Sequence, residues 1–171
     1  MLVEKKNKKD GLRILGVDPG YERLGLAVVE KKQGEKERVI YSECFRTDKK
    51  LPHSVRLVNI GVRVREIIEK FKPDCLSIEK LFFNTNQKTA LLVSEARGII
   101  LYEAAREGVL IEEFNPSQIK IAVAGDGHAD KAQVIKMVTL LVKTKLSGKQ
   151  DDEYDAVAAA LTSLAHKKNL G

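Results

Sequence analysis

An apolar run, LRILGV, ends on a single aspartate, Asp18, and the chain then turns through Pro19 and Gly20 before a second apolar run begins at Leu24. Asp, Pro and Gly in this order suit a tight turn between two strands, which is one sufficient explanation of Asp18. A carboxylate at the end of a buried strand is costly unless it has a partner. Other acidic residues that converge on Asp18 would therefore give it a function.

Apolar periodicity predicts an α/β domain built on one sheet. Alternating apolar residues predict an antiparallel meander of three strands at residues 12–17, 24–31 and 38–46, and short apolar runs predict two more strands at residues 75–78 and 109–114. Apolar residues at steps of three to four predict helices at residues 51–71, 87–107, 116–124, 131–143 and about 151–166. This order indicates a five-stranded mixed sheet flanked by helices on both faces.

The 171 residues suffice for one domain with a full core, which we place at residues 12–168, after a basic tail at residues 1–11 that we expect to be disordered. No apolar run is long enough to span a bilayer, and the N-terminus lacks the apolar core of a signal peptide, so we expect a soluble, cytoplasmic protein without membrane contacts. Its two cysteines indicate neither a disulfide framework nor a zinc site. The net charge of +6 favours a polyanionic partner.

A second carboxylate, Glu79, also stands at the end of an apolar run. Because a helix separates this strand from the first, the two strands are expected to be parallel and joined by a crossover connection. Strands that run in the same direction end at the same edge of the sheet. The sequence therefore predicts that Asp18 and Glu79 lie close together.

Two further carboxylates, Asp152 and Asp155, stand three residues apart in the first turn of the last helix, so both are expected on one side of it. Asp151 and Glu153 are better explained as residues that favour a helix N-terminus. Carboxylates brought together require positive charge, and oxygen ligands favour Mg²⁺ or Mn²⁺ over Zn²⁺. Two such ions about 4 Å apart would support phosphodiester hydrolysis.

Four motifs carry a family resemblance: LGVDPG at residues 15–20, SIEKLFF at 77–83, SEARG at 94–98 and DEYDAVAAAL at 152–161. Together they resemble the RuvC family of bacterial Holliday junction resolvases, which have a ribonuclease H-like fold. The resemblance extends over residues 12–166, in the right order and at plausible spacings.

The resemblance implies a homodimeric, Mg²⁺-dependent endonuclease that nicks two opposing strands of a four-way DNA junction in recombination and repair. It also implies two metal ions per site, Mn²⁺ as a substitute metal, and cooperation with the branch-migration proteins RuvA and RuvB. The implied metal-binding catalytic acids are Asp18, Glu79, Asp152 and Asp155. Many relatives have His where this chain has Asp152, which leaves the separate role of that residue open.

The implied DNA contacts are one aromatic and four basic side chains. Phe82 would stack on unpaired bases, whereas one of the two adjacent phenylalanines, Phe83, is expected to pack beneath its loop. Lysines are by default surface residues, so the basic residues are marked by the resemblance alone. The expected DNA-binding residues are Phe82, Lys88, Arg97, Lys120 and Lys131.

The helix at residues 87–107 has more apolar positions than one buried face needs, so it is the predicted dimer interface, with Leu92 and Ile99 as the residues to test. Three alternatives stand beside the resolvase. One is a related nuclease acting on another branched DNA or RNA, and another is a junction-binding module without activity. The third, an ATP-binding protein of the actin and sugar-kinase type, needs a second phosphate hairpin and roughly twice the length.

Overall fold

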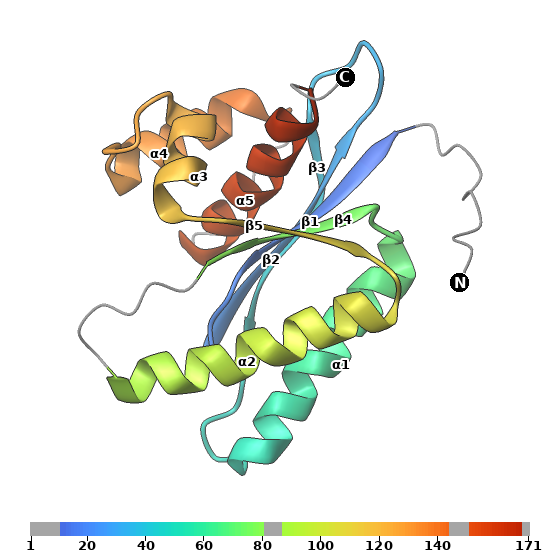
Figure 1. Ribbon diagram of the computed structural model, residues 1–171, viewed down its shortest axis with the longest axis vertical. Coiled ribbons are helices and arrows are strands. Elements are labelled where there is room, and N and C mark those ends of the chain that lie inside the picture. The colour runs from blue at the N-terminus through green and yellow to red at the C-terminus, as the bar shows by residue number, and fades with distance from the viewer. Residues whose placement is uncertain (1–10, 81–86, 144–150, 169–171) are drawn as a thin grey trace.

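A computed structural model describes residues 11–80, 87–143 and 151–168, so the predicted basic tail lies outside the described residues except for Gly11. The chain forms a five-stranded sheet in the order β3-β2-β1-β4-β5 (Figure 1). The strands are β1 Leu12–Asp18, β2 Arg23–Lys31, β3 Arg38–Arg46, β4 Cys75–Glu79 and β5 Leu110–Phe114. β2 is antiparallel to β1 and β3, whereas β4 is parallel to β1 and β5. The predicted α/β class and mixed sheet are confirmed.

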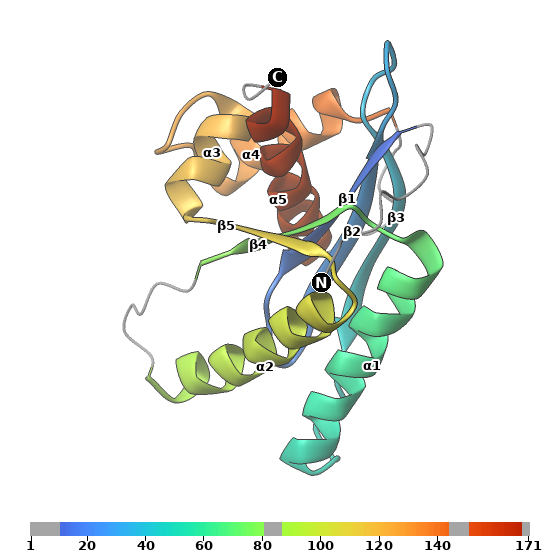
Figure 2. The same cartoon turned by 45° about the vertical axis from the view of Figure 1, so that its right-hand side comes forward.

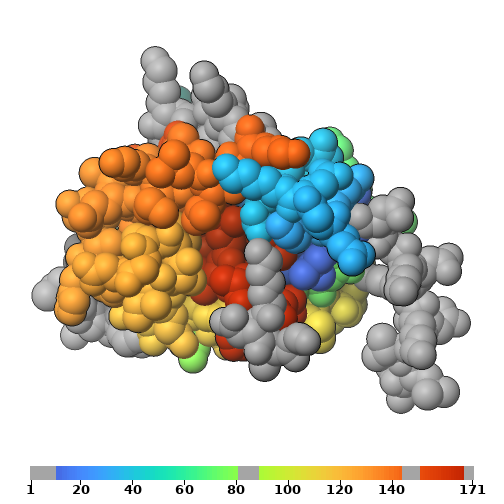
Figure 3. Space-filling model, turned by 90° about the horizontal axis from the view of Figure 1, so that it is seen from above, coloured from blue at the N-terminus to red at the C-terminus, as the bar shows by residue number. Residues whose placement is uncertain are grey.

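Five helices complete the described fold: α1 His53–Phe71, α2 Gln87–Arg106, α3 Pro116–Ala124, α4 Lys131–Leu141 and α5 Asp151–Lys168. α1 begins two residues later than predicted because Pro52 has extended dihedral angles and acts as its N-cap. α4 ends two residues earlier than predicted, since Val142 is extended and the N–H of Lys143 donates to the carbonyl of Glu37 at 3.0 Å. This contact joins the end of α4 to the β2–β3 connection, and the two segments meet in Figure 3.

The helices lie in two layers, with α1 and α2 on one face of the sheet and α3, α4 and α5 on the other (Figures 1 and 2). Side chains alternate between the faces along each strand. Ile14 of β1 belongs to the core under α5, whereas Leu15 and Val17 belong to the core under α1 and α2. Asp18, one step further along β1, is therefore on the α5 face.

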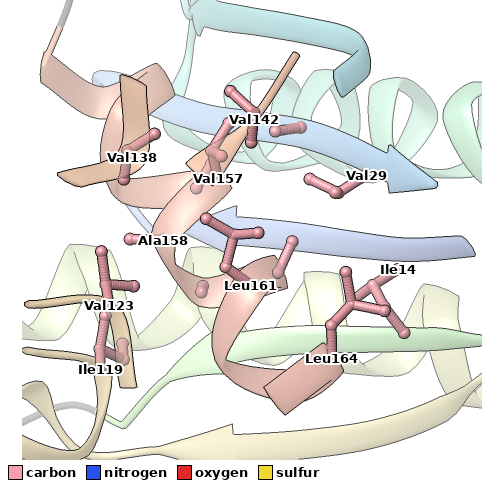
Figure 4. Close-up of a cluster of buried hydrophobic side chains, with 14 of the residues drawn as sticks. Ile14, Val29, Ile119, Val123, Val138, Val142, Val157, Ala158, Leu161 and Leu164 are labelled. Atoms are coloured by element: carbon pink, nitrogen blue, oxygen red, sulfur yellow. The ribbon is translucent and has the colours of Figure 1, made fainter. Parts of the chain in front are cut away.

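The core under α5 is built largely from small and branched residues (Figure 4). Residues 156–160 of α5 are fully or almost fully buried and read AVAAA, so the helix approaches the sheet closely. Ser77 of β4 donates a hydrogen bond from its hydroxyl to the carbonyl of Ala159 at 2.6 Å, directly across this interface. Within the described residues, no helix has the length and apolar character needed to cross a membrane.

Candidate active site

Asp18 and Glu79 end neighbouring parallel strands and face the same helix. The preceding residues, Val17 and Ile78, are register partners, so the two carboxylates are adjacent at the carboxyl edge of the sheet. Alternation places Glu79 on the α5 face, because Ser77, two residues earlier, contacts α5. The convergence expected from the crossover topology is thus present in the backbone.

The first turn of α5 supplies two more carboxylates, and these are directed to different neighbours. Asp155 accepts a hydrogen bond from the ammonium group of Lys131, at the start of α4. Asp152 instead contacts residues of β2 and β3: its carboxylate lies 3.4 Å from the guanidinium of Arg23 and 3.4 Å from the Sγ of Cys44, which donates to it. Both residues adjoin Asp18, but they do not project in one common direction.

The Asp18 carboxyl has a strongly perturbed pKa. Burial, followed by the negative charges of Asp155, Glu79 and Asp152, raises its pKa to about 7, although the positive charge of Lys131 partly opposes the shift. A carboxyl that resists ionisation at the centre of three others is a position where added positive charge would be stabilising. Perturbed groups of this kind cluster at functional sites.

Glu79 and Asp155 share this environment. Burial and the charge of Asp155 raise the pKa of Glu79, and Lys131 and Lys120 oppose that shift. Burial likewise raises the pKa of Asp155, although Lys131 opposes it. Burial alone would lower the pKa of Lys131, but its hydrogen bond to Asp155 and the surrounding carboxylates raise it instead. Lys131 therefore supplies positive charge to the acidic cluster from within the protein.

The turn after Asp18 is held by a compact hydrogen-bonded group. The guanidinium of Arg56, on α1, stacks on the ring of Tyr21 at 3.9 Å and donates to the hydroxyl of Thr47 at 2.8 and 3.0 Å. That hydroxyl donates to the carbonyl of Tyr21 at 2.8 Å. Arg56 and Thr47 are buried, so this group fixes the backbone that follows Asp18.

The donor set fits a hard divalent cation, because it consists of carboxylates and one of them has a pKa near neutrality. Among the described residues, no three acidic, histidine or cysteine side chains are already gathered closely enough to hold a metal ion. Asp155 contacts Lys131 and Asp152 contacts Arg23 instead. Metal binding by the cluster would therefore require these two carboxylates to turn toward Asp18.

The expected DNA contacts fall into three groups. Phe82 and Phe83, like the side chain of Lys88, lie outside the described residues. Lys120, half-buried on α3, and Lys131 both lie close enough to lower the pKa of Glu79. Arg97 contacts the protein itself: it donates to the carbonyl of Glu79 at 3.3 Å and forms an ion pair with Glu113.

Sequence reasoning missed the partners of Asp152. Arg23 and Cys44 belong to strands β2 and β3, and neither stands in a recognisable motif. Glu153, interpreted as a helix-start residue, is buried and accepts a hydrogen bond from the hydroxyl of Ser42 at 2.6 Å. Arg23 stands at the start of a strand, and nothing in the neighbouring sequence predicts that its side chain lies beside the acids.

A mixed sheet whose neighbouring parallel strands end on acids, with further acids on a helix packed across them, defines the class of ribonuclease H-like nuclease domains. The family model described as "Crossover junction endodeoxyribonuclease RuvC" matches residues 14–163. The chain therefore belongs to the RuvC family, which confirms the resemblance seen in the four motifs.

Individual relatives agree with this assignment. The chain is 42% identical over 148 residues to the crossover junction endodeoxyribonuclease RuvC of Moorella thermoacetica, covering 86% of this chain and 88% of that protein. It is 45% identical over 148 residues to the crossover junction endodeoxyribonuclease RuvC of Halothermothrix orenii, covering 86% of this chain and 89% of that protein. The structure of Thermus thermophilus RuvC in complex with a Holliday junction substrate matches with a TM-score of 0.86 and 34% identity, over 92% of this chain and 96% of that chain.

A more distant structure extends the likeness in fold alone. The yeast mitochondrial Holliday junction resolvase Ydc2 matches with a TM-score of 0.70 at 14% identity, over 93% of this chain and 80% of that chain.

Proposed function

We propose that this chain is a divalent-metal-dependent endonuclease that resolves four-way DNA junctions by nicking opposing strands. The observation that carries the proposal is the group of four carboxylates at one end of the sheet, contributed by β1, β4 and α5. The raised pKa of Asp18, about 7, supports a site that is completed by a cation. Family membership supports the substrate class.

The proposed metal ligands are Asp18, Glu79, Asp152 and Asp155. A bound Mg²⁺ or Mn²⁺, with two ions at full occupancy, would supply activation of a water molecule and stabilisation of the charge that develops on the phosphate. Asp18 would be central, because the charges of the other three acids all act on its carboxyl. Asp152 would bind a metal ion or orient the water molecule, and it would do so through the carboxylate that Arg23 contacts in this structure.

The two lysines nearest the acids have a separate proposed role. Lys131 and Lys120 lie close enough to Glu79 for their positive charges to oppose the rise in its pKa. If Asp155 held a metal ion, the ammonium group of Lys131 would be available to a phosphate oxygen. Lys88 and Phe82 remain proposed DNA contacts on the basis of the family motifs.

The decisive experiment compares cleavage of a synthetic four-way junction, the matching linear duplex and an RNA–DNA hybrid in the presence of Mg²⁺. We expect paired, symmetric nicks in the junction alone. If the hybrid is cleaved and the junction stays uncut, the proposed junction specificity is wrong. If no substrate is cleaved, the proposed catalytic activity is wrong. Chelation of the metal should abolish nicking.

Variants of the acids separate chemistry from binding. Asp18→Asn and Glu79→Gln keep the shape of each side chain while removing its charge, so we expect nicking to fall by about a thousandfold or more with junction binding retained. Glu66→Gln is a control, because Glu66 is an exposed carboxylate on α1, which covers the face of the sheet opposite to α5. Wild-type nicking in Asp18→Asn would remove Asp18 from the site.

We propose that the active form is a homodimer, which would present two identical sites to a junction with near two-fold symmetry. The exposed apolar residues of α2 are Leu91 and Tyr102, at 63% and 59% exposure. The residues first chosen from the sequence are less suitable probes, since Leu92 packs against the core and Ile99 lies against Gly61 of α1. In sedimentation, Leu91→Glu with Tyr102→Glu should yield monomers, and an intact dimer would exclude this face.

Cooperation with the branch-migration proteins RuvA and RuvB is proposed from family membership. Co-sedimentation of the three proteins on a four-way junction tests it, and independent sedimentation would contradict it.

A further inference from the structure

Gly25 lies at the closest approach between α5 and the sheet. It is the register partner of Asp18 in the β1–β2 pair, so it shares the α5 face with that carboxylate. A β-carbon at Gly25 would lie 2.0 Å from the carbonyl oxygen of Asp152 and 3.0 Å from the Cβ of Asp18. The backbone of Asp152 and the side chain of Asp18 thus both lie within 3.0 Å of one point above Gly25.

The atoms around this point have little freedom to move. The contact at Asp152 is with the helix backbone, so rotation of a side chain cannot relieve it. One turn further along, a β-carbon at Gly16 would lie 1.9 Å from the carbonyl oxygen of Ala156. The hydrogen bond from Ser77 to Ala159 holds the next part of the helix against β4. A side chain at Gly25 would therefore lift the first turn of α5 while the rest of the helix stays anchored.

We propose that Gly25 is a positioning residue that sets the separation between Asp18 and the two acids of α5, Asp152 and Asp155. The inference rests on the proposed function, because the spacing matters only if these acids share metal ions. Magnesium requires nearly ideal octahedral geometry, and metal–ligand distances are fixed within about 0.2 Å. A displacement of α5 on the order of 1 Å would therefore be felt in metal affinity as well as in rate.

The first test measures Mn²⁺ affinity by calorimetry and unfolding by heat for the wild type, Gly25→Ala and Ala27→Val. Ala27 lies on the same face of β2 and is fully buried in the core under α5, so its enlargement strains the same interface further from the acids. Both variants should lose stability. Only Gly25→Ala should lose Mn²⁺ affinity, by about tenfold or more. Equal Mn²⁺ affinities of Gly25→Ala and Ala27→Val would overturn the inference.

The second test adds length to a carboxylate. Asp155→Glu reaches one methylene further, so in the Gly25→Ala background it should restore at least about a third of the lost affinity, whereas a purely structural defect would not be restored. In the wild-type background the same substitution should weaken Mn²⁺ binding, because the longer side chain would not suit the spacing that Gly25 sets. Unchanged affinity of Asp155→Glu alone overturns the inference even if Gly25→Ala does not fold.

The two levels of proposal fail differently. If the wild type binds no Mn²⁺ and does not nick a junction, the proposed function fails and this inference fails with it. If the wild type does both and Gly25→Ala matches it in affinity, only the spacing inference is overturned.

Discussion

The ammonium group of Lys131, at the start of α4, is bound to the carboxylate of Asp155, in the first turn of α5. It also lies 3.9 Å from the carboxylate of Asp151. A lysine in this position neutralises part of the acidic cluster, and it occupies a carboxylate that the proposed metal ion requires. The ammonium group and the proposed metal ion would therefore compete for Asp155.

Substitution of Lys131 should separate metal affinity from catalysis. In Lys131→Met we expect Mn²⁺ affinity measured by calorimetry to rise by about threefold to tenfold, since a competing charge is removed. Nicking should nevertheless fall by about a hundredfold, because positive charge near the phosphate is lost. Lys136→Met, an exposed lysine on the same helix, should change neither quantity. Weaker Mn²⁺ binding in Lys131→Met would show that the two cations do not compete.

The raised pKa of Asp18 predicts how the metal-free fold responds to pH. The pKa is about 7 in the folded chain and 3.8 ordinarily, so between these values the unfolded chain is ionised while the folded chain keeps its proton. Stability consequently falls as the pH rises from about 4 to about 7, and the loss is complete above that range. In chelator at about pH 8, Asp18→Asn should be more stable by on the order of 2 kcal/mol, or roughly 4–8 °C in Tm.

The same experiment at about pH 3, below the ordinary pKa of 3.8, provides the control, since Asp18 is then largely protonated in both the folded and the unfolded chain and the gain should vanish. Mg²⁺ should raise the Tm of the wild type at the higher pH and leave Asp18→Asn unchanged. An equal rise in both proteins would place the metal away from Asp18.

Arg97 was expected to contact DNA, and its contacts within the protein predict a different defect. Because Arg97 donates to the carbonyl of Glu79 and pairs with Glu113, Arg97→Met should disturb the end of β4 and weaken Mn²⁺ binding by about threefold or more. A role limited to DNA would lower junction affinity instead and leave Mn²⁺ affinity unchanged. Calorimetry with metal and gel-shift titration with a junction distinguish the two results.

The group around Tyr21 predicts a stability defect at the turn. Arg56→Met removes two hydrogen bonds to Thr47 and the stacking contact with Tyr21, so we expect a loss of about 2–3 kcal/mol in the free energy of unfolding. Lys49→Met, which breaks an exposed ion pair with Glu22, should cost much less than Arg56→Met. Denaturant unfolding measures both, and equal losses would show that the buried group does not stabilise the turn.

The sequence predicted the meeting of Asp18 and Glu79 because a strand–helix–strand connection fixes strand direction, and strand direction fixes which ends meet. It could not predict the partners of Asp152. One of these partners depends on the register between β2 and β3. Glu30 of β2 is paired with Arg38 of β3, and a regular ladder continued from that pair would place Glu43 opposite Gly25. An irregularity between Val28 and Val29 shifts the register by one residue, so Cys44 takes that position and faces α5.

Helix positions show the same limit. The periodicity of α2 identified its apolar residues, but it could not separate half-buried Leu92 from exposed Leu91. That distinction depends on the angle at which α2 packs against α1 and β5, which no local pattern encodes. The ion pair of Arg97 with Glu113 depends on the same packing.

α5 is the last element of the described chain, and it carries both Asp152 and Asp155 and much of one core. During synthesis, a chain that ends before this helix holds only Asp18 and Glu79 of the proposed site. The order of translation therefore postpones the assembly of a DNA-cutting centre until the rest of the domain has been made. A product that ends before α5 would lack two of the four proposed metal ligands together with much of one core.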